Sequence, residues 1–512
     1  MAPIPAFTSH QGFVGSRTAR TLAETARSPW ALSWPLGIGL AVFVCPLNIE
    51  GLPLLADPDS HWHIAIGKWI LVNGTVPTVD GYSHTFFGRP WIAKEWLSQT
   101  LLAGAYELGG WSAVAALCAA AIGFAFALMM RLLLRDIRPL PAALFTIAAI
   151  VMCAPHFLAR PHVLAFPVML IWVAGLVRAV EERRIPDPIL LLAMLLWANL
   201  HGGFTLGLVL CGAFALEALT TARDAEERSF LLVEWAKFTA AAVLVACITP
   251  YGPESILVTF RIVDLGDALN MISEWKSPDF QSQPLQEVIL LVGLYACLSR
   301  GLKLPLVRLL IIIGLVHLYL RYARNAELLA ILAPLVIAPV LARQWPALRP
   351  NYEALTGSTL MQRMAEMGRL AGARAIALCL LLMLVFAAGM TRFATIRPPE
   401  ATTPAAAFDY IREANLHGPV FNHYGFGGFL IHAGIPTFID GRGELYGGEF
   451  IKHYVEAISL RGDTSLEQML DQYKIEWTFL LKDQAANRLL ARLPGWKHAY
   501  TDDTATIYVR RR

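Results

Sequence analysis

Charged residues are scarce in this sequence. Only 16% of its 512 residues are Asp, Glu, Lys or Arg, against about 25% in a typical soluble protein, and 56% are hydrophobic. This composition excludes a water-soluble enzyme over the whole chain, and it excludes a disordered protein. The net charge of +3 is small and is spread among the loops, so no nucleic-acid partner is expected.

Cysteine patterns that bind metals or form disulfide scaffolds are also missing. The seven cysteines include no CxxC pair and no Cys/His ligand spacing, and all lie in or beside apolar stretches. We interpret them as small buried hydrophobic residues. The first thirty residues are polar and lack the usual form of a cleavable signal peptide, so we expect a cytoplasmic tail followed by a retained signal anchor.

Long apolar runs dominate the chain, and a run of about 20 residues is enough for a helix to cross a bilayer. The candidate spans are 31–55, 112–134, 139–158, 162–180, 188–200, 204–221, 230–249, 285–299, 304–321, 325–342 and 373–391. A further run, 96–109, is short, and we expect it to be re-entrant or interfacial. The sequence thus predicts a polytopic α-helical membrane domain over 31–392, with about 11–13 spans, after a cytoplasmic tail of residues 1–30.

Residues 393–512 are polar and are separated from the last span by a proline-rich boundary. Alternating helix and strand patterns predict a small α/β domain there. The predicted helices are 404–415, 449–461 and 465–473, and the predicted strands are 418–424, 436–440, 475–481 and a hairpin over 496–510. No P-loop and no strand–GxGxxG–helix unit occurs, so a nucleotide site is not expected.

Lys and Arg are concentrated in every second loop, which sets the orientation of the spans. With the N-terminus in the cytoplasm, the basic cytoplasmic loops are 131–138, 178–187, 222–229, 300–303 and 343–372. The first outer loop, 56–95, and the C-terminal domain are then periplasmic. We expect a multi-pass protein of a bacterial inner membrane.

Ionisable residues that are hard to explain as membrane structure fall on this outer side or at its edge. Such groups are costly near lipid and are a functional-site hypothesis by default. They are Asp57, Asp59, Glu95, Arg160, His162, His201, Glu274, Arg321, Arg324 and Asp440. The alternative explanation for the position of any single one of these residues is that polar side chains commonly occur at helix ends.

The first outer loop carries the strongest signal. Asp59 or Ser60 is suited to cap a helix. Apolar side chains then recur at helical spacing, as is typical of a helix at the membrane interface: Trp62, Ile66, Trp69 and Ile70. A carboxylate at this position can deprotonate an acceptor hydroxyl or amine. We therefore predict Asp59, together with Asp57, as catalytic, with helix capping as the alternative.

The order of motifs in this loop resembles a known family. An acidic pair, an interfacial helix, Gly74-x-x-Pro77, and then Arg89-Pro90-Trp91 with Lys94-Glu95 resemble the first periplasmic loop of the GT-C superfamily. That superfamily includes protein O-mannosyltransferases and the lipid A aminoarabinose transferase. Asp59 matches the family's catalytic acidic position, and Arg89-Pro90-Trp91 with Lys94-Glu95 corresponds to its Lys-Pro-Pro-Leu segment with Trp for the second Pro. The resemblance covers the first 135 residues.

The resemblance implies an inverting glycosyltransferase that takes a sugar from a polyprenyl-phosphate donor. The acceptor would be a glycan, a lipid or a protein. Cationic groups would hold the phosphate, which arginine binds bidentately. The predicted substrate-binding residues are Lys94, Glu95, Arg160, His162, His201, Glu274, Trp275, Arg321, Arg324, Asp440 and Arg442. For Arg321 and Arg324 the alternative is snorkelling to the interface, and for Asp440 and Arg442 it is a structural ion pair. No cofactor is predicted; a divalent ion held by Asp57-Pro58-Asp59 is the alternative, and it is not favoured.

Two other functions stay open from the sequence. A polysaccharide polymerase or ligase that uses polyprenyl-diphosphate glycans would also use outer arginines, but it would not need the acidic loop motif. A transporter, or a non-catalytic membrane partner, is the second. Transporters favour charges at mid-membrane and broken helices in paired halves, whereas the charges here cluster at the outer face and no repeat is present.

The predicted topology can be tested with reporter fusions. Alkaline phosphatase fused after Arg512 should be active, because the C-terminal domain is predicted to be periplasmic. A silent phosphatase together with a fluorescent cytoplasmic reporter at the same point would overturn the assignment.

Overall fold

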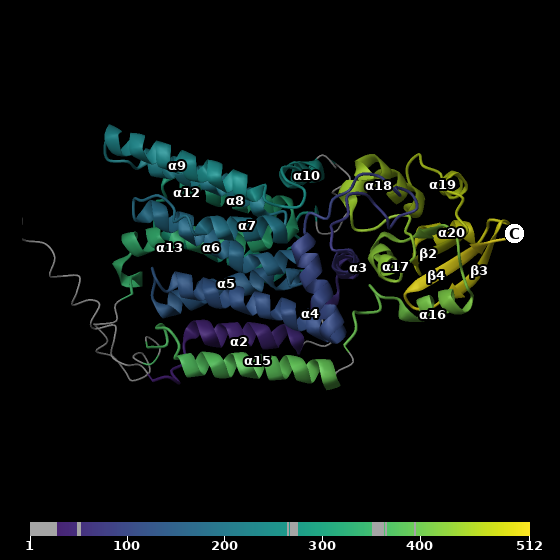
Figure 1. Ribbon diagram of the computed structural model, residues 1–512, viewed down its shortest axis with the longest axis horizontal. Helices are drawn as coiled ribbons and strands as arrows, with labels where there is room; N and C mark the ends of the chain where they lie inside the picture. Colours follow the sequence, from purple (N-terminus) through teal and green to yellow (C-terminus); the bar gives the residue numbers. More distant parts are fainter. Residues whose placement is uncertain are drawn as a thin grey trace, which may run out of the picture.

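The computed structural model describes residues 28–48, 53–263, 266, 275–350, 363, 366–393 and 396–511. A bundle of helices and a smaller domain with a sheet lie next to each other along the longest axis (Figure 1). This confirms the predicted fold class, an α-helical membrane protein with a small C-terminal α/β domain.

A helix lies over each of the predicted apolar runs. The bundle helices are α2 (Trp34–Leu47), α4 (Trp96–Leu133), α5 (Pro139–Cys153), α6 (Pro161–Glu181), α7 (Leu190–Leu200), α8 (Phe204–Thr220), α9 (Ala225–Ala246), α11 (Pro284–Ser299), α12 (Leu306–Arg321), α13 (Ala326–Gln344) and α15 (Ala373–Phe393). In the part of the chain that the structure describes, six helices are long and apolar enough to cross a membrane. Four apolar helices are shorter: α2, α7, α8 and α11.

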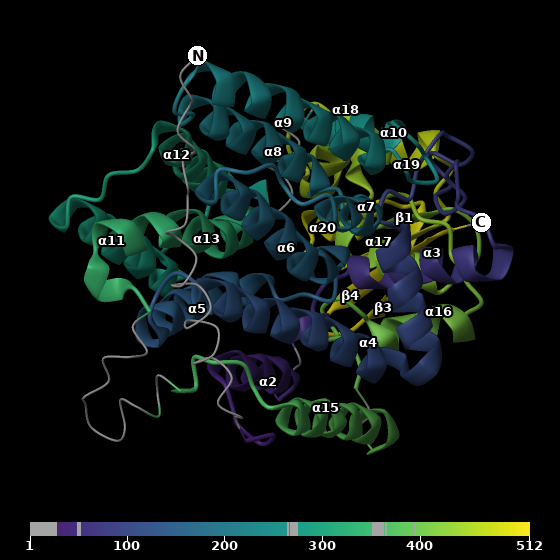
Figure 2. The ribbon, with the colours of Figure 1, turned by 60° about the vertical axis from the view of Figure 1, so that its left-hand side comes forward.

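Short elements connect the bundle helices. They are the 3-10 turns η2 (Pro53–Leu55), η3 (Ala154–His156), η6 (Ala323–Asn325) and η7 (Pro346–Leu348), and the helices α3 (Asp59–Asn73) and α10 (Glu254–Val263). Helices α2 and α15 run side by side at one edge of the bundle in both views (Figure 1, Figure 2).

Residues 96–109 are set apart from the predicted span 112–134 by a kink. They form the first part of α4, and the non-helical dihedrals of Gly109 and Gly110 divide α4 into two helical segments at this point. The short first segment stays a candidate re-entrant or interfacial helix. Gly109 also lies against α15, because a Cβ there would be 2.6 Å from Cγ2 of Thr391. A side chain at this position would push the two helices apart.

Helix α3 forms as predicted, but its cap and its surroundings differ from the prediction. Pro58 occupies the N-cap position and no side chain caps the helix, while Oδ1 of Asp57 accepts a hydrogen bond from the backbone N–H of Asp59, the first helical residue, at 2.7 Å. The apolar side chains of α3 are mostly buried within the protein rather than exposed to lipid, with Ile66 at 0% and Ile70 at 7% exposure. They pack against α4 and the C-terminal domain, so α3 connects the two parts of the molecule (Figure 1).

The described residues of the C-terminal domain contain a four-stranded sheet with the order β1-β2-β4-β3. The strands are β1 (Val420–Asn422), β2 (Trp477–Leu481), β3 (Trp496–Thr501) and β4 (Ala505–Arg510). Strand β1 is parallel to β2, with Phe421 opposite Thr478, and the other pairs are antiparallel. The helices are α16 (Ala405–Glu413), α17 (Gly427–His432), α18 (Gly443–Ser459), α19 (Leu466–Gln472) and α20 (Ala485–Leu490), with the turn η8 (Tyr424–Phe426).

The predicted strand 436–440 is wrong. This segment makes only an isolated bridge between Thr437 and Ser83 of the first outer loop. The backbone N–H of Thr437 donates to the carbonyl of Tyr82 at 3.0 Å, and that of Phe438 donates to the side chain of Asn422 at 2.8 Å. The segment therefore attaches the loop to the domain instead of joining the sheet. Helices α17 and α20 were not predicted.

A buried network around Arg442 holds this attachment. The Arg442 guanidinium donates to both carboxylate oxygens of Asp440, at 2.8 and 2.7 Å, and to Oδ1 of Asp80 at 2.6 Å. All three side chains are fully buried. Tyr446 donates to Asp440 at 2.6 Å, and the guanidinium carbon lies 4.9 Å from the centre of the Trp91 ring. Burial opposes ionisation of Asp440, but Arg442 and these hydrogen bonds hold the pKa of its carboxyl below the usual value.

A second buried ion pair lies at the opposite end of the bundle. Nε of Arg308, on α12, donates to Glu217 of α8 at 2.8 Å, and its Nη2 lies 2.7 Å from Glu181 of α6. The carbonyl of Val336 on α13 accepts from Nη1 at 3.1 Å. Four helices are thus tied together at the predicted cytoplasmic end, away from the C-terminal domain.

The Arg442 network should dominate the stability of the C-terminal domain. Arg442→Met leaves two carboxylates buried without their cation, so we expect a loss of about 3–5 kcal/mol in the free energy of unfolding. The exposed pair of Arg412 and Asp409 on α16 provides a control, and Arg412→Met should cost less than about 1 kcal/mol. Apparent unfolding temperatures of the purified protein measure both. Equal shifts for the two variants would contradict the prediction.

Candidate functional site

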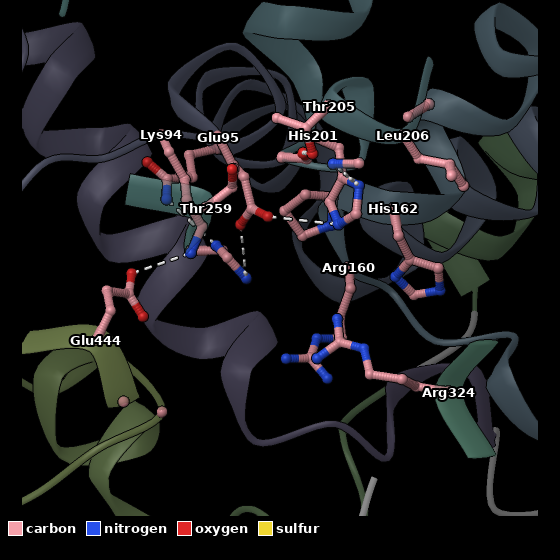
Figure 3. A pocket seen from close by; sticks show the side chains of 18 of the residues that line it. Lys94, Glu95, Arg160, His162, His201, Thr205, Leu206, Thr259, Arg324 and Glu444 are labelled. Carbon is pink, nitrogen blue, oxygen red and sulfur yellow. Dashed lines mark hydrogen bonds and ion pairs between the residues drawn. The ribbon is translucent and has the colours of Figure 1, made fainter. Parts of the chain in front are cut away.

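A cavity of about 300 Å³ lies where the bundle meets the C-terminal domain. Its walls come from the segment before α4, the start of α6, the turn between α7 and α8, the residues around η6, and the start of α18. Seven of the predicted site residues line it: Lys94, Glu95, Arg160, His162, His201, Trp275 and Arg324. Figure 3 shows most of these side chains pointing toward one another.

Arg160 is held by the acidic pair of the first outer loop. It occupies the extended position before α6, whose helix begins at Pro161. Its Nη1 lies 3.2 Å from Oδ2 of Asp57, and its Nη2 donates to Oδ2 of Asp59. Gly441 of the C-terminal domain covers the carboxylate of Asp59, because a Cβ at Gly441 would overlap its Oδ1.

The two predicted catalytic aspartates reach the cavity only through their contact with Arg160. Arg160 lines the cavity, whereas Asp57 and Asp59 are not among the described residues that do. Their carboxylates lie behind Arg160 and orient its guanidinium. The sequence singled out the acidic pair but could not reveal that an arginine about one hundred residues later would bind it.

Arg324 brings a second guanidinium to the cavity. It follows α12 in the turn η6, and its guanidinium carbon lies 4.5 Å from the ring centre of Trp275. Arg160 and Arg324 approach each other in the lower part of Figure 3. Two guanidinium groups that line one enclosed space offer several N–H donors to a single anion. The geometry therefore suits a phosphate or a similar anion.

Lys94 connects the cavity wall to the C-terminal domain. Its Nζ donates to Oε1 of Glu444 at 3.1 Å, and both side chains are mostly buried. Glu444 lies in the first turn of α18 and also lines the cavity. The sequence did not single out Glu444, although an acidic residue at a helix N-terminus directly after the predicted pair Asp440 and Arg442 was an available signal.

Glu95, the residue after Lys94, lies between two histidines. Its Oε1 is 3.5 Å from Nε2 of His201, and its Oε2 is 3.9 Å from Nε2 of His63. Burial raises the pKa of Glu95, and Lys94 and Arg160 oppose this effect. Burial lowers the pKa of His201 well below its usual value, with smaller effects in the same direction from neighbouring cations. His63 was missed because it appeared only as part of the interfacial helix.

His162 faces another acid that the sequence did not indicate. Its Nε2 lies 3.5 Å from Glu327 and 3.0 Å from the backbone carbonyl of His156. Glu327 is in the first turn of α13, three residues after Arg324, and lines the cavity. The cavity wall therefore contains Glu95, Glu327 and Glu444 beside its cations.

Three of the predicted substrate-binding residues that the structure describes do not line this cavity. Arg321 is exposed at the end of α12, with its guanidinium 5.7 Å from the ring of Tyr322. Asp440 and Arg442 are fully buried in the network described above, so the structure favours the structural ion pair. Glu274 lies outside the described residues.

The candidate metal ligands Asp57 and Asp59 both bind Arg160. Over the described ranges, no group of three or more His, Cys, Asp or Glu side chains has the spacing to hold a metal ion.

The fold is similar to those of solved membrane glycosyltransferases. The structure of ArnT from Cupriavidus metallidurans in the apo state aligns with a TM-score of 0.51 and 13% sequence identity, covering 96% of this chain and 98% of that one. The apo oligosaccharyltransferase of Archaeoglobus fulgidus aligns with a TM-score of 0.50 and 10% identity, covering 87% of this chain and 69% of that one.

Comparisons by sequence gave no match. No protein-family model matches the chain, and no curated protein matches it. At such low identity the structural similarity establishes the fold alone. Both solved structures belong to the GT-C superfamily, so the chain has the GT-C fold that the motifs of its first outer loop predicted.

Proposed function

We propose that this protein is an inverting glycosyltransferase that moves a sugar from a polyprenyl-phosphate donor to a hydroxyl or amine of a glycan, lipid or protein acceptor. The observation that supports it most is the convergence of Arg160 and Arg324 in one cavity beside the acidic pair of the first outer loop. In the proposed topology the cavity faces the periplasm at the outer surface of the bacterial inner membrane.

The chemistry of the donor fits these side chains. When the bond between the sugar and the phosphate breaks, negative charge develops on the leaving phosphate. Two guanidinium groups can bind its oxygens through several N–H donors, and Lys94 adds a third cation to the lining of the cavity. We propose that Asp57 and Asp59 keep Arg160 oriented toward the phosphate. The indole of Trp275 beside Arg324 offers an apolar face to the sugar or to the prenyl chain.

A polymerase or ligase acting on polyprenyl-diphosphate glycans would use the same arginines. The acidic pair bound to Arg160 favours the monophosphate donor, because the sequence resemblance assigns that pair to the GT-C transferases. A transporter is disfavoured, since the charged cluster lies at one end of the bundle, against the C-terminal domain.

The two cavity arginines should be required for binding of the donor's phosphate. In Arg160→Lys and Arg324→Lys a point charge replaces a planar group with several fixed donors. Losing one charge-assisted hydrogen bond weakens binding by about 10- to 100-fold. The measurement is the affinity of the purified protein in nanodiscs for undecaprenyl phosphate. Arg321→Lys is the matched control and should bind normally, because Arg321 lies on the surface three residues away from Arg324. Normal binding by both cavity variants would reject the phosphate site.

Asp59→Asn tests the role of the acidic pair. The substitution keeps the size of the side chain but removes the charge that faces Arg160, so undecaprenyl phosphate should bind about tenfold more weakly or worse. Asp409→Asn, in an exposed pair of the C-terminal domain, controls for the change of carboxylate to amide. If Asp59→Asn binds the lipid normally but loses sugar transfer, Asp59 acts directly on the acceptor, as the family resemblance implies.

A further inference from the structure

Glu95 is a mostly buried carboxylate in the lining of the cavity. It precedes α4, its side chain is 13% exposed, and it lines the cavity. Figure 3 shows it directed into the cavity with His201 on one side. Its two oxygens face two different histidines, His201 and His63, which come from separate parts of the chain.

The hydrogen bonds of His201 fix which ring nitrogen carries the proton. The backbone N–H of Gly203 donates to Nδ1 at 3.1 Å, so Nδ1 must present its lone pair. A neutral ring then has its proton on Nε2, the atom that lies 3.5 Å from Oε1 of Glu95. Burial keeps the ring neutral, since it lowers the pKa of His201 well below the usual value. His201 is therefore a donor aimed at the Glu95 carboxylate.

His63 is arranged in the same way on the other oxygen. Its Nδ1 lies 3.3 Å from Nε2 of Gln99, whose amide can donate to it. The proton of the neutral ring is then on Nε2, 3.9 Å from Oε2 of Glu95. The ring of Trp62 packs against His63, with the ring centres 3.7 Å apart. Two Nε2–H groups of fixed tautomer thus face a single buried carboxylate, the nearer at 3.5 Å.

The surroundings of Glu95 suit a general base. Burial raises its pKa from the usual value, and a base works best when its pKa is near the working pH. The titratable and charged groups that face it come from every wall: His63 on α3, Lys94 beside it, Arg160 before α6, His201 after α7, Arg324 in η6 and Glu444 on α18. The cations favour the ionised form, while Glu444 opposes it.

Asp59 is less suited to receive a proton from an acceptor. Its carboxylate binds Arg160, and Gly441 packs directly over it. An ion pair with arginine stabilises the charged form and makes the carboxylate a weaker base. An acceptor could contact Asp59 only after Arg160 or the turn of the C-terminal domain had moved.

We propose that Glu95, positioned by His201 and His63, is the catalytic residue that accepts the proton of the sugar acceptor; this rests on the proposed glycosyltransferase function. The acceptor oxygen or nitrogen forms a bond to the anomeric carbon of the sugar. The bond from that carbon to the phosphate oxygen breaks, and its electron pair stays on the phosphate. The acceptor's proton goes to a Glu95 oxygen and then to water. The products are the glycosylated acceptor and polyprenyl phosphate.

The test separates the proton acceptor from the phosphate site. Purified protein in nanodiscs is supplied with synthetic polyprenyl-phosphate sugars and with envelope extract from cells that lack the gene, and released polyprenyl phosphate is measured. Glu95→Gln should lower turnover by about 10²–10⁴-fold. Its affinity for undecaprenyl phosphate should stay within about threefold of the wild-type value. This change is smaller than the loss of affinity that the removal of one charge-assisted hydrogen bond causes. Glu107→Gln is the matched control, because Glu107 is an exposed residue of α4 that pairs with Lys68. Its turnover and its affinity for undecaprenyl phosphate should equal the wild-type values.

The positioning role of His201 has its own readout in the pH profile. The base must be ionised, so turnover falls as the pH drops through the pKa of Glu95. His201→Phe removes an N–H that stabilises the carboxylate, which raises this pKa and moves the acid limb to higher pH. His201→Gln restores a donor and should move the limb back. A merely structural role for His201 would lower activity at all pH values without moving the limb.

The outcomes distinguish the inference from the function on which it rests. A wild-type protein that neither binds undecaprenyl phosphate nor releases it from any donor overturns both. An active wild type with a fully active Glu95→Gln variant overturns the inference alone. If Glu95→Gln does not fold, Glu95→Asp provides the test, because it keeps the charge but moves the carboxylate away from the acceptor by one methylene group. Wild-type turnover of Glu95→Asp with an unmoved acid limb also overturns the inference.

Discussion

The buried ion pairs of Arg442 with Asp440 and Asp80 are the contacts on which the geometry of the site depends. Asp80 belongs to the first outer loop, and Arg442 follows it by 362 residues. Removing an arginine from water costs several kcal/mol, which only charged, well-oriented partners offset. Those partners are complete only when the loop and the C-terminal domain are packed together. Formation of this contact therefore also brings Glu444 to Lys94 and Gly441 to Asp59, which closes one side of the cavity.

Each ionisable side chain of the cavity has a protein partner in place. Arg160 faces the acidic pair, Lys94 faces Glu444, and Glu95 faces two histidines. Groups that are already oriented need little reorganisation when charge develops in a reaction, so each contributes more than the same group in water. The enclosed position strengthens these interactions further, because water screens them poorly there. The carboxylates in and behind the lining also offset the repulsion between the cavity's two arginines.

The membrane helices could be predicted from sequence because hydropathy is a local property, and the acidic pair because it lies beside the first span. The segment 436–440 has the apolar pattern of a strand, but its backbone groups bond to the first outer loop and to Asn422. Arg321 and Arg324 look equivalent in the sequence; the end of α12 at Arg321 leaves one on the surface and directs the other inward. Glu444 and Glu327 acquire their roles only through contacts between distant segments, which no local pattern records.

The packing of Gly441 against Asp59 indicates that the carboxylates near the cavity have different roles. Because no side chain fits at Gly441, the turn of the C-terminal domain can cover the acidic pair and shield its ion pairs with Arg160 from water. Shielding from water strengthens the ion pairs that hold the Arg160 guanidinium. Carboxylates that are bound to a cation in this way are poor proton acceptors. Glu95 has the opposite environment: it faces the cavity, and its oxygens lie 3.5 and 3.9 Å from the imidazoles of His201 and His63 rather than against a guanidinium. One set of acids can therefore fix the phosphate-binding cation while another remains basic enough to take a proton.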